Sequence, residues 1–422
     1  MSMGAPTGLP SAAALSNSLA REYEVVEGEA LPKELHQDLE AFARFVHSRG
    51  ELRDHLIRKV PWDKFRRNPN AAHQAVADLL LVSGISAAVS TNYDTHIEDA
   101  ATALGERDFI AALDGDHIAR LPNRYRPLLK IHGCAHEREN IVWLVEQLAV
   151  EPIKARIERS RMWAEYTLRQ HDLLFVGFWS DWAYLNGVLE SVVTNVETRE
   201  PRKVIVVDPK NPPELQEKAS GLWAWATGSE HIDFIHVRER AEVFMEQLVL
   251  EVGHLFLRRL LNAGKAMYEE LAGEPAPDNL NVPRAHSVSS LYNLRRDLTG
   301  VGPADCVATI SPAGLEVLGA IMLKLLHLGA DLEGPVIRIN GERIRLISAG
   351  GQLMSRVRAR IDSGPPTSHE VDRVVCVGGV PDAGVSSVIR GDRRASIARP
   401  SLSAQWECAD RLIGELFPGA AA

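Results

Sequence analysis

The sequence predicts an α/β protein with a doubly wound parallel sheet, followed by a smaller C-terminal α+β domain. Short apolar segments typical of buried strands recur through the first part of the chain. Segments with helical periodicity separate them, and strands that alternate with helices favour a parallel sheet. Residues 272–286 then carry three prolines among Gly, Asn and Asp, a composition that indicates a boundary between domains.

The composition is that of an ordinary globular protein. The 422 residues are 45% hydrophobic and 24% charged, and this length suggests about two or three domains. A net charge of -9 provides no general attraction to nucleic acid, so direct nucleic-acid binding is not expected. No apolar run is long enough to span a membrane, and the start lacks the pattern of a secretory signal. The four cysteines are scattered, which argues against a cysteine-rich metal site and suits a cytoplasmic protein.

The elements of the first domain, residues 1–271, follow from local patterns. Ser11 is a suitable N-cap for a helix that begins the chain. Helical periodicity over residues 31–83 predicts a helical insertion. Helices are also predicted at 95–104, 141–170, 182–193 and 241–271, and the basic stretch within 141–170 is expected to be a solvated face. The predicted strands of the sheet are 87–90, 128–131, 172–178, 203–208 and 234–237.

The second domain, residues 287–422, has a different pattern. An apolar helix is predicted at 313–328 and a hairpin at 336–347, whose turn is Asn340-Gly341. A buried strand at 373–377 and a closing helix at 402–417 complete it. The hairpin carries arginines at 338, 343 and 345, which form either a solvated face or a contact face for a partner. We expect this domain to mediate assembly, because it has no cluster of titratable residues typical of a catalytic site.

Polar residues follow two of the predicted strands. Asn92 lies just after the strand at 87–90, and His132 lies just after the strand at 128–131. Ligands bind at the carboxyl ends of strands in open parallel sheets. An amide there can orient a nucleophile and an imidazole can accept its proton, so Asn92 and His132 are the candidate catalytic residues. A structural interpretation also fits: Asn92 as a turn residue, with Asp94 capping the next helix, and His132 as a core histidine.

Four motifs at strand ends occur in a particular order. They are Ser-Thr-Asn-Tyr-Asp at 90–94, Lys-Ile-His-Gly at 130–133, Val-Gly-Phe-Trp-Ser-Asp at 176–181 and Val-Val-Asp at 206–208. This order resembles the sirtuin superfamily, a Rossmann variant, and especially the sirtuin-like NAD-cleaving domains of bacterial anti-phage defence proteins. The resemblance covers about residues 1–250 and makes Asn92 and His132 catalytic. It implies that NAD is bound by Asp94, Gly177, Ser180, Asp181 and Asp208.

The sequence departs from that family in two respects that affect the expected function. The paired Cys-x-x-Cys motifs of the zinc-dependent deacetylases are absent, so the resemblance implies NAD hydrolysis to nicotinamide and ADP-ribose without a metal. The initial strand and its Gly-Ala-Gly-x-Ser loop are also absent, and we expect them to be encoded upstream of Met1. Three alternatives therefore remain: an NAD glycohydrolase, a module that senses NAD or ADP-ribose, and a structural subunit. The implied partners are other copies of the chain, a DNA-translocating ATPase or a short Argonaute.

Overall fold

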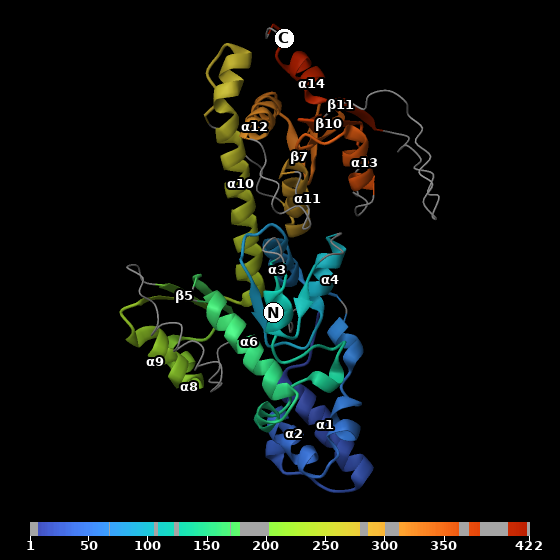
Figure 1. Cartoon of the computed structure of the whole chain (residues 1–422), viewed down its shortest axis with the longest axis vertical. Helices are drawn as coiled ribbons and strands as arrows, with labels where there is room; N and C mark the ends of the chain where they lie inside the picture. The colour runs from blue at the N-terminus through green and yellow to red at the C-terminus, as the bar shows by residue number, and fades with distance from the viewer. Residues whose placement is uncertain are drawn as a thin grey trace. The chain divides into compact units, whose positions relative to one another are not determined.

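The computed structural model describes ten stretches of the chain. They are residues 7–66, 68–104, 109–121, 126–168, 170–177, 202–278, 286–299, 312–362, 371–379 and 404–419. Contacts between Cα atoms divide the chain into two compact units (Figure 1). The N-terminal unit comprises residues 1–102 and 108–246, and the C-terminal unit comprises 103–107 and 247–422.

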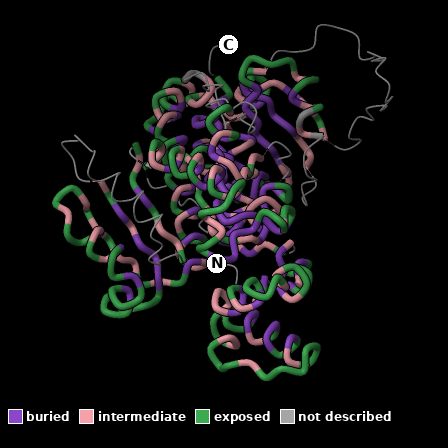
Figure 2. The backbone as a smooth tube through the Cα atoms, turned by 60° about the horizontal axis from the view of Figure 1, so that its bottom comes forward, coloured by how far each residue is buried: buried purple, intermediate pink, exposed green. Residues whose placement is uncertain are grey.

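The N-terminal unit begins with helices whose starts are fixed by side-chain caps. Ser11 accepts a hydrogen bond from the Ala14 amide, as the sequence predicts, and Asp38 and Asn70 cap two later helices. Buried faces of these helices alternate with exposed ones (Figure 2), and the buried faces enclose Tyr23 and Phe42. The helices are α1 Ala12–Glu27, α2 Leu39–Ser48 and α3 Ala71–Leu81, with single turns at Lys33–His36, Arg53–Ile57 and Trp62–Arg66.

Parallel strands form two three-stranded sheets in this unit. The first has the order β1-β3-β2, and the second has the order β4-β5-β6. The strands are β1 Ala88–Ser90, β2 Ala111–Ala112, β3 Leu128–Lys130, β4 Leu173–Val176, β5 Arg202–Val207 and β6 Ile232–Val237. The helices are α4 His96–Ala103, α5 Gly115–Ala119, α6 Ile153–Leu168, α8 Pro212–Lys218 and α9 Ser220–Gly228. The predicted α/β class with parallel strands is confirmed.

The two sheets differ from the single sheet that the sequence predicts. Within the described residues, β1 and β4 each pair on one side only, so each forms the edge of its sheet. Val89 of β1 is 42% exposed and Leu174 of β4 is 37% exposed, which is unusual for a parallel sheet because its strands are normally covered. The predicted helix at 182–193 lies outside the described residues.

The C-terminal unit contains a five-stranded sheet of order β11-β10-β9-β8-β7. Strands β9, β10 and β11 are parallel, whereas β7, β8 and β9 are antiparallel, as expected for an α+β domain. The strands are β7 Asp331–Glu333, β8 Val336–Ile339, β9 Glu342–Ser348, β10 Arg373–Val377 and β11 Gln405–Cys408. The helices are α10 Ala241–Ala272, which crosses from the first unit, α11 Val288–Thr299, α12 Pro312–His327, α13 Met354–Asp362 and α14 Ala409–Leu416.

Local patterns predicted the helix α12, the hairpin and β10 of this unit, but they gave no prediction for α11, β7 or α13. The hairpin β8–β9 turns at Asn340 and Gly341, both with positive φ, which is the geometry that Asn-Gly favours. The predicted helix at 402–417 is wrong in its first part. Residues 405–408 form β11, because Trp406 pairs with Val374 of β10 and this long-range pairing overrides local helical preference.

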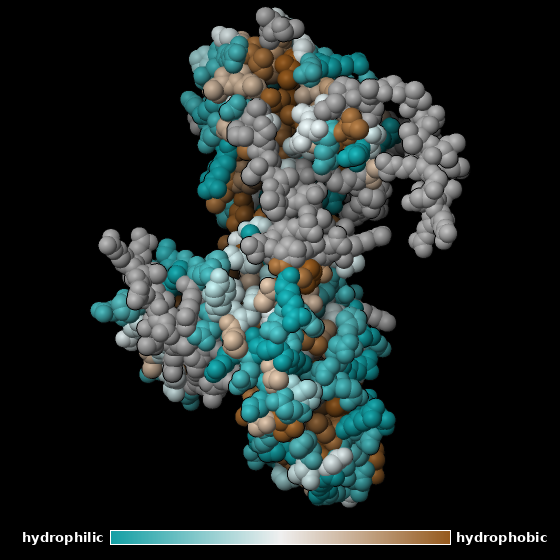
Figure 3. All heavy atoms as spheres, viewed as in Figure 1, coloured by the Kyte–Doolittle hydropathy of each residue, from teal (hydrophilic) through white to brown (hydrophobic). Residues whose placement is uncertain are grey.

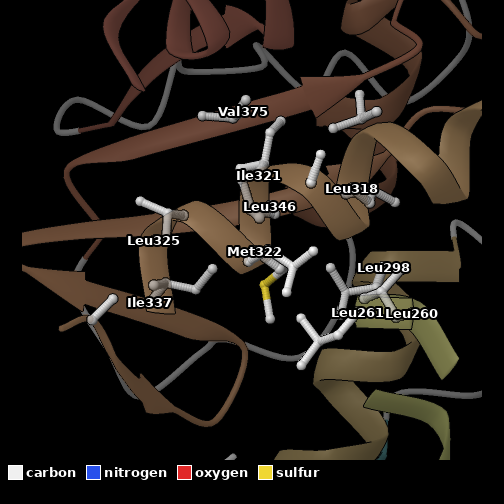
Figure 4. Close-up of a cluster of buried hydrophobic side chains, with 14 of the residues drawn as sticks. Leu260, Leu261, Leu298, Leu318, Ile321, Met322, Leu325, Ile337, Leu346 and Val375 are labelled. Carbon is white, nitrogen blue, oxygen red and sulfur yellow. The ribbon is translucent and has the colours of Figure 1, made fainter. Parts of the chain in front are cut away.

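The core of the C-terminal unit lies between the sheet and the helices α10 and α12. Figure 4 shows α12 side chains facing the sheet, together with two leucines from α10. The labelled residues of this core are Leu260, Leu261, Leu298, Leu318, Ile321, Met322, Leu325, Ile337, Leu346 and Val375. Gly264 of α10 and Gly319 of α12 permit backbone contact between the two helices, because a Cβ on Gly264 would lie 2.1 Å from the Gly319 carbonyl carbon. Hydrophobic side chains follow α10 (Figure 3), and Leu255 is 50% exposed.

Candidate functional site

Asn92 and His132 lie at the carboxyl ends of neighbouring strands. β1 and β3 are parallel and paired in register, with Ser90 opposite Lys130, so each candidate residue follows the last paired position by two residues. The His132 imidazole forms a hydrogen bond with the backbone of Thr91, the residue before Asn92. The structure therefore brings together the two loops that carry the candidate catalytic residues.

The loop that carries Asn92 is fixed by hydrogen bonds on several sides. The Asn92 amide donates to Ser90 Oγ at 3.1 Å, and the Ala135 amide donates to the Tyr93 carbonyl at 2.7 Å. Tyr93 Oη donates to the Val142 carbonyl at 3.0 Å, and the Val142 amide donates to the His132 carbonyl at 2.8 Å. These bonds connect the segments after β1 and β3, so backbone contacts fix the relative position of Asn92 and His132.

Gly133 allows the chain to turn sharply after His132. Its φ of +110° is a conformation that other residues rarely adopt. A Cβ at this position would lie 2.8 Å from the Ile141 Cα and 3.1 Å from the Asn140 carbonyl oxygen. The His-Gly pair thus has a structural explanation: glycine permits the close approach of residues 140–141 behind His132.

Burial keeps His132 neutral. The side chain is 3% exposed, and this burial lowers its pKa from 6.5 to about 4. The hydrogen bond with the Thr91 backbone raises the pKa, whereas the nearby charge of Arg156 lowers it further. A neutral imidazole that donates one N–H to a carbonyl has an acceptor at its other nitrogen. His132 can therefore accept a proton, while the exposed residue Asn92 can contact a ligand.

Asp94 is placed for a structural role at the same site. It is 5% exposed, and its Oδ1 accepts a hydrogen bond from the His96 amide at 3.3 Å, at the start of α4. This contact corresponds to the capping role that the sequence allowed. Contact between Asp94 and NAD stays a prediction.

The other predicted NAD-binding residues follow the strands of the second sheet. Gly177 follows β4 with a φ of +64°, and its amide donates to the Val207 carbonyl at 3.2 Å. Asp208 follows β5, is 7% exposed, and accepts a hydrogen bond from the Lys210 amide at 2.9 Å. Gly177 and Asp208 are thus neighbours at adjacent strand ends of the β4-β5-β6 sheet, whereas Asn92 and His132 follow strands of the β1-β3-β2 sheet. Ser180 and Asp181 lie outside the described residues.

Sequence reasoning missed two buried cations beside the first pair. Arg156 was expected on a solvated helix face, but it is 9% exposed and donates to the Asn140 carbonyl at 2.8 Å. Lys130, at the end of β3, is 2% exposed. The prediction for Arg156 failed because α6 begins only at Ile153 and turns this residue towards the segment after His132. A lysine inside an apolar strand was the available signal for Lys130, because a buried ammonium requires partners.

Comparison with known proteins assigns part of the N-terminal unit. Residues 86–232 match the SIR2-like domain, and the match begins just before β1 and ends at the first residue of β6. None of the curated proteins compared with the chain matches it. SIR2-like domains bind NAD, so this match supports a sirtuin-like family and an NAD-related function for the region that contains Asn92 and His132.

The part of the chain that the structure describes contains no group of three or more His, Cys, Asp or Glu side chains arranged to hold a metal ion. No helix among these described residues has the length and apolar character needed to cross a membrane.

Proposed function

We propose that the chain is an NAD glycohydrolase that cleaves NAD to nicotinamide and ADP-ribose and acts in anti-phage defence by depleting NAD. The observation that carries the proposal is the placement of Asn92 and His132 on loops joined by a hydrogen bond, within the region that matches the SIR2-like domain. The resemblance to defence proteins supports the biological role.

The two residues have complementary roles in this reaction. The bond between ribose C1′ and the nicotinamide nitrogen breaks, its electron pair goes to nicotinamide, and an oxocarbenium-like state develops on the ribose. A general acid is unnecessary, since nicotinamide leaves as a neutral molecule. Asn92 orients the attacking water through its amide, and His132 takes the proton that this water loses on forming the new C1′–O bond. A weak base suffices because the water becomes strongly acidic once its oxygen begins to bond to the electrophilic C1′ carbon, and it then loses its proton readily.

The direct test is incubation of the purified protein with NAD, with the products measured by mass spectrometry. We expect stoichiometric nicotinamide and ADP-ribose, and a loss of about 10²–10⁴-fold in turnover for Asn92→Ala and His132→Ala. His47→Ala, a change at an exposed histidine, is the matched control and should retain wild-type turnover. A folded His132→Ala variant with near wild-type turnover would contradict the assignment.

The other interpretations predict different results. Binding of NAD without nicotinamide release would favour a sensing module, and absence of both would favour a structural subunit. The defence role predicts that cellular NAD falls after phage infection in cells with wild-type protein but not with Asn92→Ala. Co-purification tests the proposed ATPase or Argonaute partner, and light scattering of the full chain tests homo-oligomer formation, which we expect residues 287–422 to mediate.

A further inference from the structure

We propose that Lys130 is a positioning residue that connects the strand carrying His132 to the loop carrying Asn92. The effect on catalysis that we infer for Lys130 rests on the proposed function. Lys130 is the last residue of β3 and precedes His132 by two positions. Its Nζ donates to the Asp94 carbonyl and lies 3.2 Å from Glu98 Oε1 in the first turn of α4. One side chain thereby holds the end of the Asn-Tyr-Asp loop and the start of the helix that follows it.

The contact of the Lys130 ammonium with its protein partners is largely buried. The Lys130 side chain is 3% exposed and that of Glu98 is 21% exposed, so the ammonium lies away from solvent and depends on these protein partners. An ammonium carries three donors, which allows it to contact a carbonyl and a carboxylate together. A methionine of similar length would fill the volume but would leave the Asp94 carbonyl and the Glu98 carboxylate without this partner.

The electrostatics of Glu98 agree with this arrangement. Burial raises the pKa of Glu98, and the charge and hydrogen bond of Lys130 lower it. Removal of the ammonium therefore favours protonation of Glu98 and ends the attraction between β3 and α4. The register of β1 and β3 remains, because Ile131 N still donates to the Ser90 carbonyl at 3.1 Å. The expected change is thus a shift of the loop at residues 91–95 rather than loss of the sheet.

The test compares Lys130→Met, Lys130→Arg and Glu98→Gln in the full chain. For Lys130→Met we expect kcat for nicotinamide release to fall about 100-fold, since misplacement by about 1 Å has such an effect, with KM changed by less than about threefold. Glu98→Gln keeps the shape of the side chain and should lose less activity. Lys130→Arg retains the charge and should restore part of kcat. Arg159→Met, which breaks the ion pair with Asp114 at 2.6 Å elsewhere in this unit, is the control and should retain kcat.

Hydrogen exchange provides a measurement independent of catalysis. Peptides covering residues 88–98 should exchange faster in Lys130→Met, while those covering α1 and α2 should not change. If the wild type cleaves no NAD, the proposed function fails and this exchange pattern alone decides the role of Lys130. Unchanged kcat in a folded Lys130→Met variant, or equal acceleration of exchange in every peptide of the unit, would overturn the proposal. If Lys130→Met does not fold, Glu98→Gln decides: a smaller fall in kcat with faster exchange confined to residues 88–98 supports the proposal, and unchanged kcat overturns it.

Discussion

Acidification should destabilise the N-terminal unit because its buried histidines are held neutral. The pKa of His132 is lowered from 6.5 to about 4 by burial, and that of His73 is likewise lowered to about 4 by burial. Between pH 6.5 and 4 the unfolded chain binds these protons and the folded chain does not. The free energy of unfolding is therefore highest above pH 6.5, and each histidine reduces it by about 1.4 kcal/mol per pH unit below that value. From pH 7 to pH 5 the loss is about 2 kcal/mol for each residue.

The comparison that isolates this effect uses His132→Asn, which cannot titrate in this range. Glu98 has a raised pKa and so contributes in the opposite direction, which makes the difference between proteins more informative than either pH curve alone. Urea unfolding at pH 7 and pH 5, followed by peptide-resolved hydrogen exchange, reports the N-terminal unit separately. We expect the variant to lose about 2 kcal/mol less than the wild type on acidification. Equal losses in the two proteins would refute the reasoning, and His47→Asn should follow the wild-type curve.

Three further predictions concern stability. Gly133→Ala should cost about 1–3 kcal/mol from its positive φ alone, measured by urea unfolding, and should also reduce NAD cleavage; an unchanged midpoint would contradict the geometry. Gly264→Ala should lower the melting temperature of the C-terminal unit, because its Cβ would overlap the backbone at Gly319; no change in calorimetry would argue against this packing. Arg345→Met should cost about 3–5 kcal/mol, since it leaves Asp297 buried with its ion-pair partner at 2.6 Å removed, and Arg345→Met/Asp297→Leu should recover much of that loss.

Local sequence patterns predicted the elements whose signals are local. The Ser11 cap, the strand at 373–377 and the Asn340-Gly341 turn follow from side-chain hydrogen bonding, apolar runs and tolerance of positive φ, and the structure confirms all three. The helix predicted across residues 405–408 failed because strand pairing with β10 depends on residues about thirty positions earlier in the sequence. The arginines of the hairpin illustrate the same limit: Arg345 is 5% exposed and pairs with Asp297, whose proximity no local pattern indicates.

The same distinction between local patterns and long-range partners applies to the candidate site. The positions of Asn92 and His132 could be predicted because a polar residue after an apolar strand marks a strand end, and parallel strand ends meet at one edge of a sheet. Their surroundings could not, because Lys130 and Arg156 are polar residues whose burial depends on partners from other segments. Those partners fix the loops, while burial lowers the pKa of His132 and the nearby charge of Arg156 lowers it further, so that the imidazole is a neutral acceptor. Strand ends therefore locate the candidate catalytic residues, while the buried cations hold the loops beside them and the burial of His132 sets its protonation.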